Sequence, residues 1–242
     1  MNSLLLKSNE IKIADAPEPK EVLLPLKGFD AEKNKLTVKE GSHVTTGAEV
    51  AQGIYSTVTG TVKSIETLPA ADASLTALRI EVSETEEFDA EITGEPDYLK
   101  KDAAELLAKL NRANLDFFEK PGDIKTVIVS AVDPEPMSAS YPQVLREYKD
   151  TVVEGLKLIK HLSGAGKVIL AVPEALQSLA AGIAASAADV FPVKPAYPNG
   201  LPEILTRDIT AKYNSGKCAF LKVEKLAAAV LSLQEGKPFT HK

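Results

Sequence analysis

Two carboxylates follow a strongly apolar segment and are the side chains in this sequence best placed to do chemistry. Thr126–Ser130 reads TVIVS, which predicts a buried strand, and Asp133 and Glu135 come shortly after it. Ligands of open α/β sheets bind at the carboxyl ends of the strands, so this acid pair is a candidate polar site. The alternative is structural: the two acids fix the turn and cap a helix that begins near Tyr141. The sequence leaves both interpretations open.

Cysteine and histidine are too sparse for metal chemistry. The 242 residues include one cysteine, Cys218, and three histidines, His43, His161 and His241, which lie far apart along the chain. One cysteine makes no intramolecular disulfide, and it supplies too few thiolates for an iron–sulfur cluster or a cysteine-based zinc site. We therefore expect no metal site and a cytoplasmic protein.

Charge and hydropathy exclude two further classes. The chain has 28 lysines and arginines against 34 acidic residues, a net charge of −6, so it lacks the excess of cations that a dedicated nucleic-acid binder uses to displace phosphate counterions. Its apolar runs at residues 4–6 and 179–188 are far shorter than the roughly 20 residues of a membrane span. We expect no nucleic-acid partner and no direct membrane insertion, so any association with a membrane goes through a partner.

Residues 22–82 predict a small all-β module, because short segments rich in β-branched residues alternate there with glycine and polar turns. The expected strands are residues 22–25, 35–38, 49–53, 57–65 and 78–82. Gly41, Gly47 and Gly60 stand where tight turns would need a positive φ. Residues 81–97 then carry eight acids and no lysine or arginine, which favours a solvated connector over an acidic docking patch.

After this connector, buried strands alternate with amphipathic helices. The expected strands are residues 126–130, 167–172, 189–193 and 218–221, and the expected helices are residues 102–110, 143–162, 174–188, 201–213 and 223–234. Parallel crossovers require the intervening helices, so the pattern predicts a mostly parallel sheet with helices on both faces, a Rossmann-like α/β domain. The glycines of residues 164–166 follow a helix and precede a strand, which indicates a helix stop rather than a dinucleotide-binding loop.

Two segments of the β-module carry a resemblance. They read VKEGSHVTTGAEVAQG at residues 38–53 and STVTGTVKSI at residues 56–65. Together they resemble the barrel-sandwich hybrid of biotinyl and lipoyl carrier domains. A carrier needs an exposed lysine at the tip of its hairpin to attach the cofactor, whereas residues 51–56 read AQGIYS. We therefore expect the fold without the carrier function.

Four further segments occur in an order and at spacings typical of one family. They read VIVSAVDPEPM (127–137), YKDTVVEGLKLIKHL (148–162), AYPNGLPEIL (196–205) and FLKVEKLAAAVLSLQEGKPFTHK (220–242). With the β-module in front, the chain resembles the C subunit of the Rnf electron-transport complex and, more distantly, the A subunit of the sodium-translocating NADH:quinone reductase. The resemblance implies a barrel-sandwich module with its connector over residues 1–97. A Rossmann-like domain related to the flavin subunit of complex I would follow over residues 98–242.

The sequence departs from that family where a flavin phosphate would bind. Members carry a glycine-rich G-x-G-G-A-x-F-P-T segment, whereas residues 111–125 read NRANLDFFEKPGDIK, with no glycine before Gly122. Glycine lets backbone amides approach a phosphate closely, so the phosphate cradle is expected to be lost.

The following turn keeps Asp133 and Glu135 but lacks the family's asparagine, cysteine and tyrosine. The sequence ends at Lys242, where the family continues into a soluble-ligand-binding β-grasp (SLBB) module and two iron–sulfur clusters, so we expect a short form without these modules.

The resemblance implies a subunit of a membrane-associated redox complex that stands on the cytoplasmic side, peripheral to the inner membrane, and is held there by the other subunits. Its cofactor-binding residues would be Asp133, Glu135, Tyr197 and Gly200, as a retained or a vestigial site. Because the phosphate loop is missing, we expect no bound cofactor and a docking or scaffold role, with no catalysis by this chain alone. The alternative is a working electron-transfer subunit that binds FMN or NADH.

Four aromatic residues would surround such a vacated cofactor cleft: Phe117, Phe118, Tyr141 and Tyr197. They would either anchor a partner or fill the space that a flavin left. The sequence does not separate these two roles.

Overall fold

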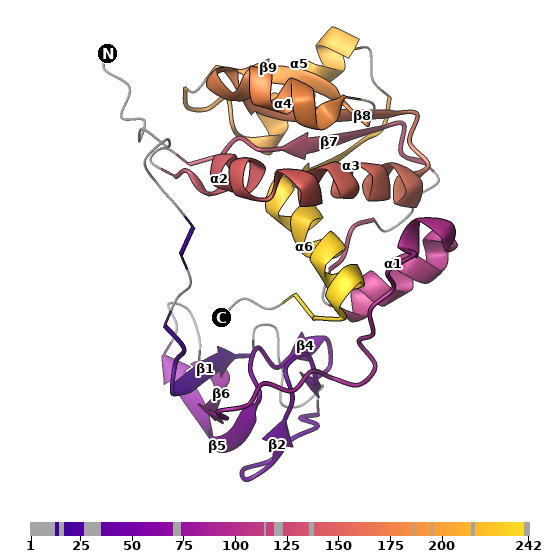
Figure 1. Ribbon diagram of the computed structural model, residues 1–242. Coiled ribbons are helices and arrows are strands. Elements are labelled where there is room, and N and C mark those ends of the chain that lie inside the picture. The colour runs from indigo at the N-terminus through magenta and orange to yellow at the C-terminus, as the bar shows by residue number, and fades with distance from the viewer. Residues whose placement is uncertain are drawn as a thin grey trace.

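The computed structural model describes residues 13–14, 17–26, 35–69, 74–113, 115–118, 123–135, 138–185, 187–194, 196–213 and 216–239. Figure 1 shows an all-β module formed by the N-terminal part of the chain and an α/β module formed by the C-terminal part. The last helix, α6 (Val223–Glu235), runs from the α/β module toward the β-module.

The β-module contains one curled antiparallel sheet and a short hairpin. The sheet has the strand order β1-β6-β5-β2, and β3 pairs with β4. The bounds are β1 (Glu21–Pro25), β2 (His43–Val44), β3 (Glu49–Ala51), β4 (Ile54–Tyr55), β5 (Gly60–Pro69) and β6 (Ser74–Val82). Side chains from all three longer strands and from the turns form one small core, which includes Leu24, Val62 and Ile80.

Two details of this module differ from the expectations. Residues 35–38 were expected to form a strand, but only an isolated bridge between Leu36 and Ala51 forms there. Gly41 and Gly47 have the expected positive φ, 81° and 88°. Gly60 instead lies in β5, where a Cβ would sit 2.1 Å from the carbonyl oxygen of Glu81. Residue 60 must therefore be a glycine because β5 and β6 pack closely there, and not because a turn requires it.

The β3–β4 hairpin turns at Gln52 and Gly53, and Gly53 has a φ of 71°. No lysine stands between Glu49 and Tyr55. That the module carries no lipoyl or biotinyl group stays a prediction.

The acidic connector is bound to both modules. On the β side, the amide of Thr46 donates to the carbonyl of Glu87 at 2.9 Å. On the α/β side, the amide of Glu95 donates to the carbonyl of Leu233, and Glu91 pairs with Arg112. The side chains of this segment are largely exposed, as expected of a solvated connector, but its backbone has fixed partners. The domain boundary expected between residues 97 and 98 stays a prediction.

The α/β module is built on a sheet of parallel strands with the order β10-β7-β8-β9. The strands are β7 (Thr126–Ser130), β8 (Lys167–Pro173), β9 (Asp189–Val193) and β10 (Cys218–Lys222). Every residue of β7 is buried, because the strand lies inside the sheet and helices cover both faces. The interpretation of TVIVS as a buried parallel strand is confirmed.

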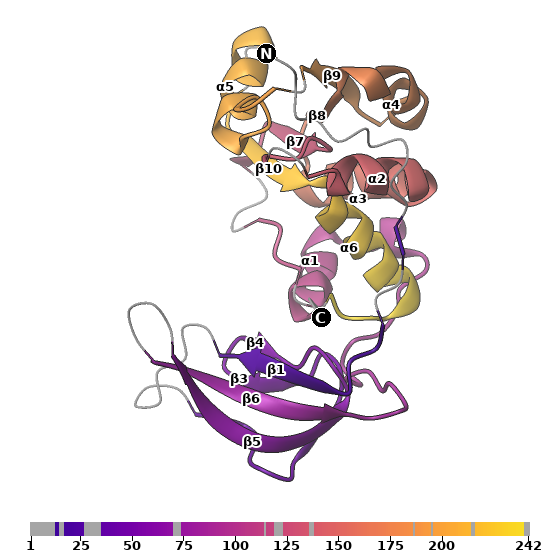
Figure 2. The ribbon, with the colours of Figure 1, turned by 90° about the vertical axis from the view of Figure 1, so that its left-hand side faces the viewer.

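Helices pack on both faces of this sheet, with α5 on the side opposite α2 and α3 (Figure 2). The helices are α1 (Ala103–Arg112), α2 (Ser140–Glu147), α3 (Lys149–Ser163), α4 (Gln177–Ala184), α5 (Pro202–Tyr213) and α6. Val127 and Leu170 point into the larger core with α3, α4 and α6, whereas Ile128 and Ile169 pack against Leu205 of α5. The predicted fold class, a β-module followed by a Rossmann-like α/β domain, is confirmed.

Two expected helices have different limits. Residues 143–162 were expected to form one helix, but the chain leaves helical geometry at Tyr148 (φ −113°, ψ 34°), between α2 and α3. Both helices bury apolar residues in the same core, so the apolar period continues across the break and conceals it. The helix expected over residues 174–188 starts as a 3₁₀ turn and ends at Ala184. An alanine-rich run contains no stop signal from which that end could be predicted.

Candidate functional site

Asp133 lies in the turn between β7 and α2, at the carboxyl edge of the sheet. Its Oδ1 accepts the hydroxyl of Ser138 at 2.9 Å and the amide of Tyr141 at 3.4 Å. These bonds fix the turn and the first residues of α2, which is the structural role considered from the sequence. Its Oδ2 is buried and has no hydrogen-bond partner among the described residues. Burial raises the pKa of this carboxyl above its usual value.

The structure brings Gly200 directly onto this turn. A Cβ on Gly200 would lie 2.3 Å from the carbonyl oxygen of Asp133 and 3.2 Å from the Cα of Pro134. The turn that precedes α5 can therefore pack here only because residue 200 has no side chain.

The other two predicted site residues do not join this contact. Tyr197 is 69% exposed, and the peptide bond to Pro198 is cis. Glu135 is also exposed. The structure thus brings together Asp133 and Gly200, and it leaves the side chains of Tyr197 and Glu135 in solvent.

Lys222 belongs to the same edge and was missed from the sequence. It ends β10 and pairs in register with Ser130 at the end of β7. Its ammonium hydrogen-bonds to the side chain of Tyr141, which raises the pKa of Lys222, and it lies 4.0 Å from a carboxylate oxygen of Glu224. The missing information was strand order: β10 comes last in the chain, and no local pattern shows that it lies beside β7.

Beside this edge, the segment that stands in place of the glycine-rich loop packs onto the first turn of α6. The ammonium of Lys225 donates to the carbonyl of Asp116 and lies 5.2 Å from the ring centroid of Phe117. The rings of Phe117 and Phe118 are tilted with centroids 6.1 Å apart, and both pack against the main core. Burial lowers the pKa of Lys225.

These contacts bear on the two roles considered for the aromatic residues. Phe117 and Phe118 are partly buried against the core, and Tyr141 is 7% exposed. Of the four, only Tyr197 is strongly exposed. The first three therefore fill space inside the module.

Two observations describe the segment where the sequence led us to expect no phosphate cradle. Residues 111–113 and 115–118 contain no glycine, and the nearby cation, Lys225, is engaged by the carbonyl of Asp116. The polar groups at the edge are one buried carboxylate oxygen of Asp133 and the ammonium of Lys222, which already contacts Tyr141 and Glu224. Over the described part of the chain, no cluster of histidine, cysteine, aspartate or glutamate could hold a metal ion.

Comparison with known proteins identifies both modules. The RnfC barrel-sandwich hybrid domain matches residues 5–86, and the Nuo51 FMN-binding domain matches residues 109–227. The first of these matches makes the chain RnfC-like, that is, similar to RnfC proteins. The resemblance drawn from the sequence motifs is therefore confirmed.

Curated relatives of the RnfC-like chain are named as the C subunits of ion-translocating oxidoreductase complexes. The protein of Serratia proteamaculans is 23% identical over 233 residues, which cover 85% of this chain and 33% of the relative. That of Citrobacter koseri is 25% identical, with the same coverage of 85% and 33%. The chain thus spans about a third of the length of these relatives.

Among solved structures, one similar structure is an NAD⁺-reducing [NiFe]-hydrogenase in the H₂-reduced state. The match covers 58% of this chain and 33% of the hydrogenase chain, with a TM-score of 0.46 and 17% sequence identity. Within the described residues of the RnfC-like chain, no helix combines the length and apolar character needed to cross a membrane.

Proposed function

We propose that this RnfC-like chain is a docking or scaffold subunit of a membrane-associated electron-transfer complex. The support is the order of its two modules, an RnfC barrel-sandwich domain followed by an FMN-binding-type domain, and relatives that are named as subunits of an ion-translocating oxidoreductase complex. Its partners are then the other subunits of such a complex. They hold the chain on the cytoplasmic side of the inner membrane.

One observation favours docking over electron transfer by this chain. The first turn of α6 is covered by the chain's own segment, through the bond from Lys225 to Asp116 and the packing of Phe117. A cofactor phosphate would need backbone amides in that neighbourhood. The segment supplies carbonyl and aromatic groups instead, so the chain assists a complex whose redox centres lie in other subunits.

The second candidate is a working subunit that binds FMN. Its support is the match of the Nuo51 FMN-binding domain to residues 109–227. In that case Asp133 and Lys222, at the carboxyl edge, would be the polar groups nearest the ligand. When bound, a flavin would supply hydride and single-electron chemistry.

The visible spectrum of the purified protein, with mass spectrometry of the small molecules released on denaturation, tests the two candidates. For the docking role we expect a colourless protein that releases no stoichiometric flavin. The same sample incubated with FMN and desalted controls for loss of flavin during purification, and it should also stay colourless. A yellow protein that releases about one FMN per chain would overturn the docking role and establish the second candidate.

A further inference from the structure

Helix α6 has two apolar faces, and only one of them lies inside the core. Val223, Leu226 and Val230 point into the main core, where α6 packs against α3. Ala228 and Leu231 lie on another face and are only half-buried. The apolar side chains of a helix normally face other apolar groups, so this second face is suited to a cover.

Ala228 and Leu231 form the floor of a groove of about 350 Å³, named here the α2/α6 groove. Val144 of α2 and Tyr148, which directly follows α2, form one wall, and residues 237–239 after α6 form the other. A volume of this size lies within the range of binding pockets in general. The groove therefore has room for a few side chains of another segment.

The charges at the groove select no occupant, because they are satisfied within this chain. A carboxylate oxygen of Glu224 lies 4.0 Å from the ammonium of Lys222, and one of Glu235 lies 2.7 Å from that of Lys237. What the groove offers is its apolar surface, so an apolar segment fits it.

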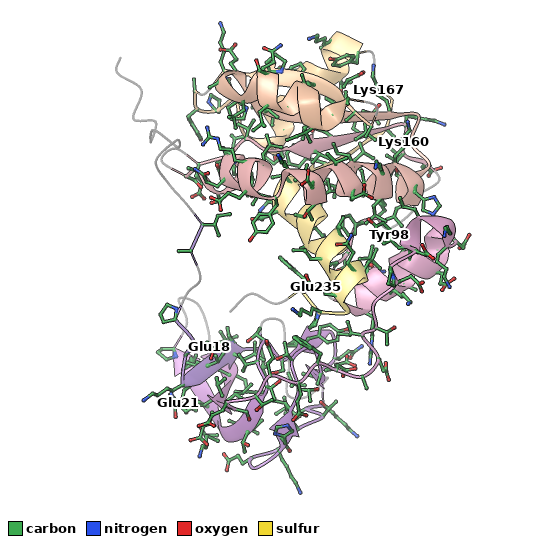
Figure 3. All side chains as sticks on the ribbon, viewed as in Figure 1. Glu18, Glu21, Tyr98, Lys160, Lys167 and Glu235 are labelled. Atoms are coloured by element: carbon green, nitrogen blue, oxygen red, sulfur yellow. The ribbon has the colours of Figure 1, made fainter. Side chains whose placement is uncertain are left out.

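The described chain begins beside the α2 wall of this groove. The amide of Ile13 donates to Oε1 of Glu147 at 3.0 Å. Glu147 is the last residue of α2 and, three positions after the wall residue Val144, its neighbour on the helix surface. Figure 3 shows Glu18 at the β-module and Glu235 at the end of α6 nearest to that module. The chain thus meets α2 at Ile13 and the β-module at Glu18, the two parts of the molecule between which the groove runs.

The residues before Ile13 contain an apolar segment. Residues 1–12, which lie outside the described part of the chain, read MNSLLLKSNEIK, so residues 4–6 are three leucines in a row. The run is too short to cross a membrane, but its side chains match the apolar floor of the groove in character.

The length of the chain allows this segment to reach the groove. Leu6 stands seven residues before Ile13, and at roughly 3.3 Å per residue an extended chain covers about 23 Å over that interval. From Ala228 to Glu235 the helix rises by about 11 Å. A tether this short holds the leucines at an effective concentration on the order of millimolar, which favours them over an occupant from another molecule.

We infer that the chain's own residues 4–6 fill the α2/α6 groove and pack their leucine side chains on Ala228 and Leu231. The segment then ties the β-module to the α/β module a second time, beside the acidic connector. The inference concerns this chain alone and does not depend on the proposed docking function. A partner subunit that used the groove would have to displace the segment.

A single tryptophan tests the inference, because the sequence contains no tryptophan of its own. Leu5→Trp places the reporter in the segment, Leu4→Trp repeats the test one position away, and Asn9→Trp is the matched control in the tether. All three are made in the full-length chain. We expect the two reporters in the segment to emit at a shorter wavelength than Asn9→Trp and to be quenched several-fold less by acrylamide, because a packed indole is shielded from water.

Substitutions in the groove connect this signal to the place. Ala228→Asp puts a charge on the floor, and Tyr148→Lys puts one on the wall, where Tyr148 is 39% exposed. Added to Leu5→Trp, each should move the emission to longer wavelength and restore quenching. Lys160→Glu, on the exposed last turn of α3, should leave the signal unchanged. Circular dichroism melts verify that the variants fold.

Three results would overturn the inference. The first is that both reporters in the segment are quenched as strongly as Asn9→Trp. The second is that they are shielded but the folded groove variants leave them so, which would place the segment elsewhere. The third is that shielding appears only as the protein concentration rises, which would make a second copy the occupant. None of these measurements involves a redox partner, so the docking function stands or falls separately.

Discussion

At the residue scale, Asp133 combines two roles that the sequence could not separate. One oxygen binds Ser138 and the amide of Tyr141, and the other is buried without a partner among the described residues. The first oxygen explains the geometry of the turn. The second has no partner to offset its burial, so it costs stability when the carboxyl is charged.

Asp133→Asn should therefore change how stability depends on pH. Because burial raises the folded pKa of Asp133, its contribution to stability is complete below the unfolded pKa, near 3.9, and is lost as pH rises through the folded pKa. The asparagine of the variant does not titrate, so the variant does not lose stability in this way as pH rises. Urea unfolding from about pH 3 to pH 7 should show the variant gaining on the unsubstituted chain as pH rises. The gain should stay below about 1 kcal/mol, because the group is only half-buried and solvent screens it.

The exposed Glu135→Gln is the control, and an equal change in both variants would contradict the assignment.

At the scale of elements, α3 and α6 approach each other closely at one glycine. A Cβ on Gly155 would lie 2.6 Å from Cγ of Leu226 and 3.3 Å from its carbonyl oxygen. This contact places α6 against the main core and so directs its other apolar face toward the α2/α6 groove.

Gly155→Ala should lower the free energy of unfolding by about 1–3 kcal/mol, because the added methyl group overpacks the interface. Gly182→Ala is the matched control: it also lies inside a helix, α4, and a Cβ there has no neighbour within 4 Å. That change should raise stability by up to about 1 kcal/mol through helix propensity. Urea denaturation measures both, and a Gly155→Ala protein as stable as Gly182→Ala would show that the helices tolerate a wider separation.

At the scale of the whole molecule, the two modules are held together around Glu95. Its amide binds the carbonyl of Leu233, and its carboxylate lies 3.1 Å from the ammonium of Lys109 and 3.6 Å from that of Lys101. Nearby, a Cβ on Gly236 would lie 2.6 Å from the amide nitrogen of Gly94. The connector and the end of α6 thus meet backbone to backbone.

Glu95→Gln should remove a contribution to stability that is present at neutral pH and is lost in acid. The hydrogen bond from Lys109 lowers the folded pKa of Glu95, so its contribution is present above the unfolded pKa, near 4.3, and is lost as pH falls through the folded value. The unsubstituted chain should have the higher urea midpoint at pH 7, and the difference should shrink toward zero as pH falls below about 4. Asp97→Asn, which breaks only an exposed pair with Lys100, should change little. A constant difference across this pH range would rule out the ion pairs as its cause.

Local patterns were enough for most of the longer helices and strands and for the family resemblance. TVIVS predicted β7, Asp102 caps α1 through bonds to the amides of residues 104 and 105, and Gly164 ends α3 in the left-handed conformation. Each of these depends on neighbours in the chain, so the sequence displays it directly. The break at Tyr148 was not visible, because two helices that share one core share one apolar period.

The site depended on contacts between segments far apart in the sequence. The residue types and the strand–helix alternation determined the fold class and placed Asp133 after a buried strand. Only the tertiary structure decided that Lys222 pairs in register with Ser130 at the end of β7, and that Lys225 binds the carbonyl of Asp116. The physical reason is that strand order and helix packing are chosen by which apolar faces cover one another, and that choice depends on the sum of many weak contacts across the whole chain rather than on any single motif.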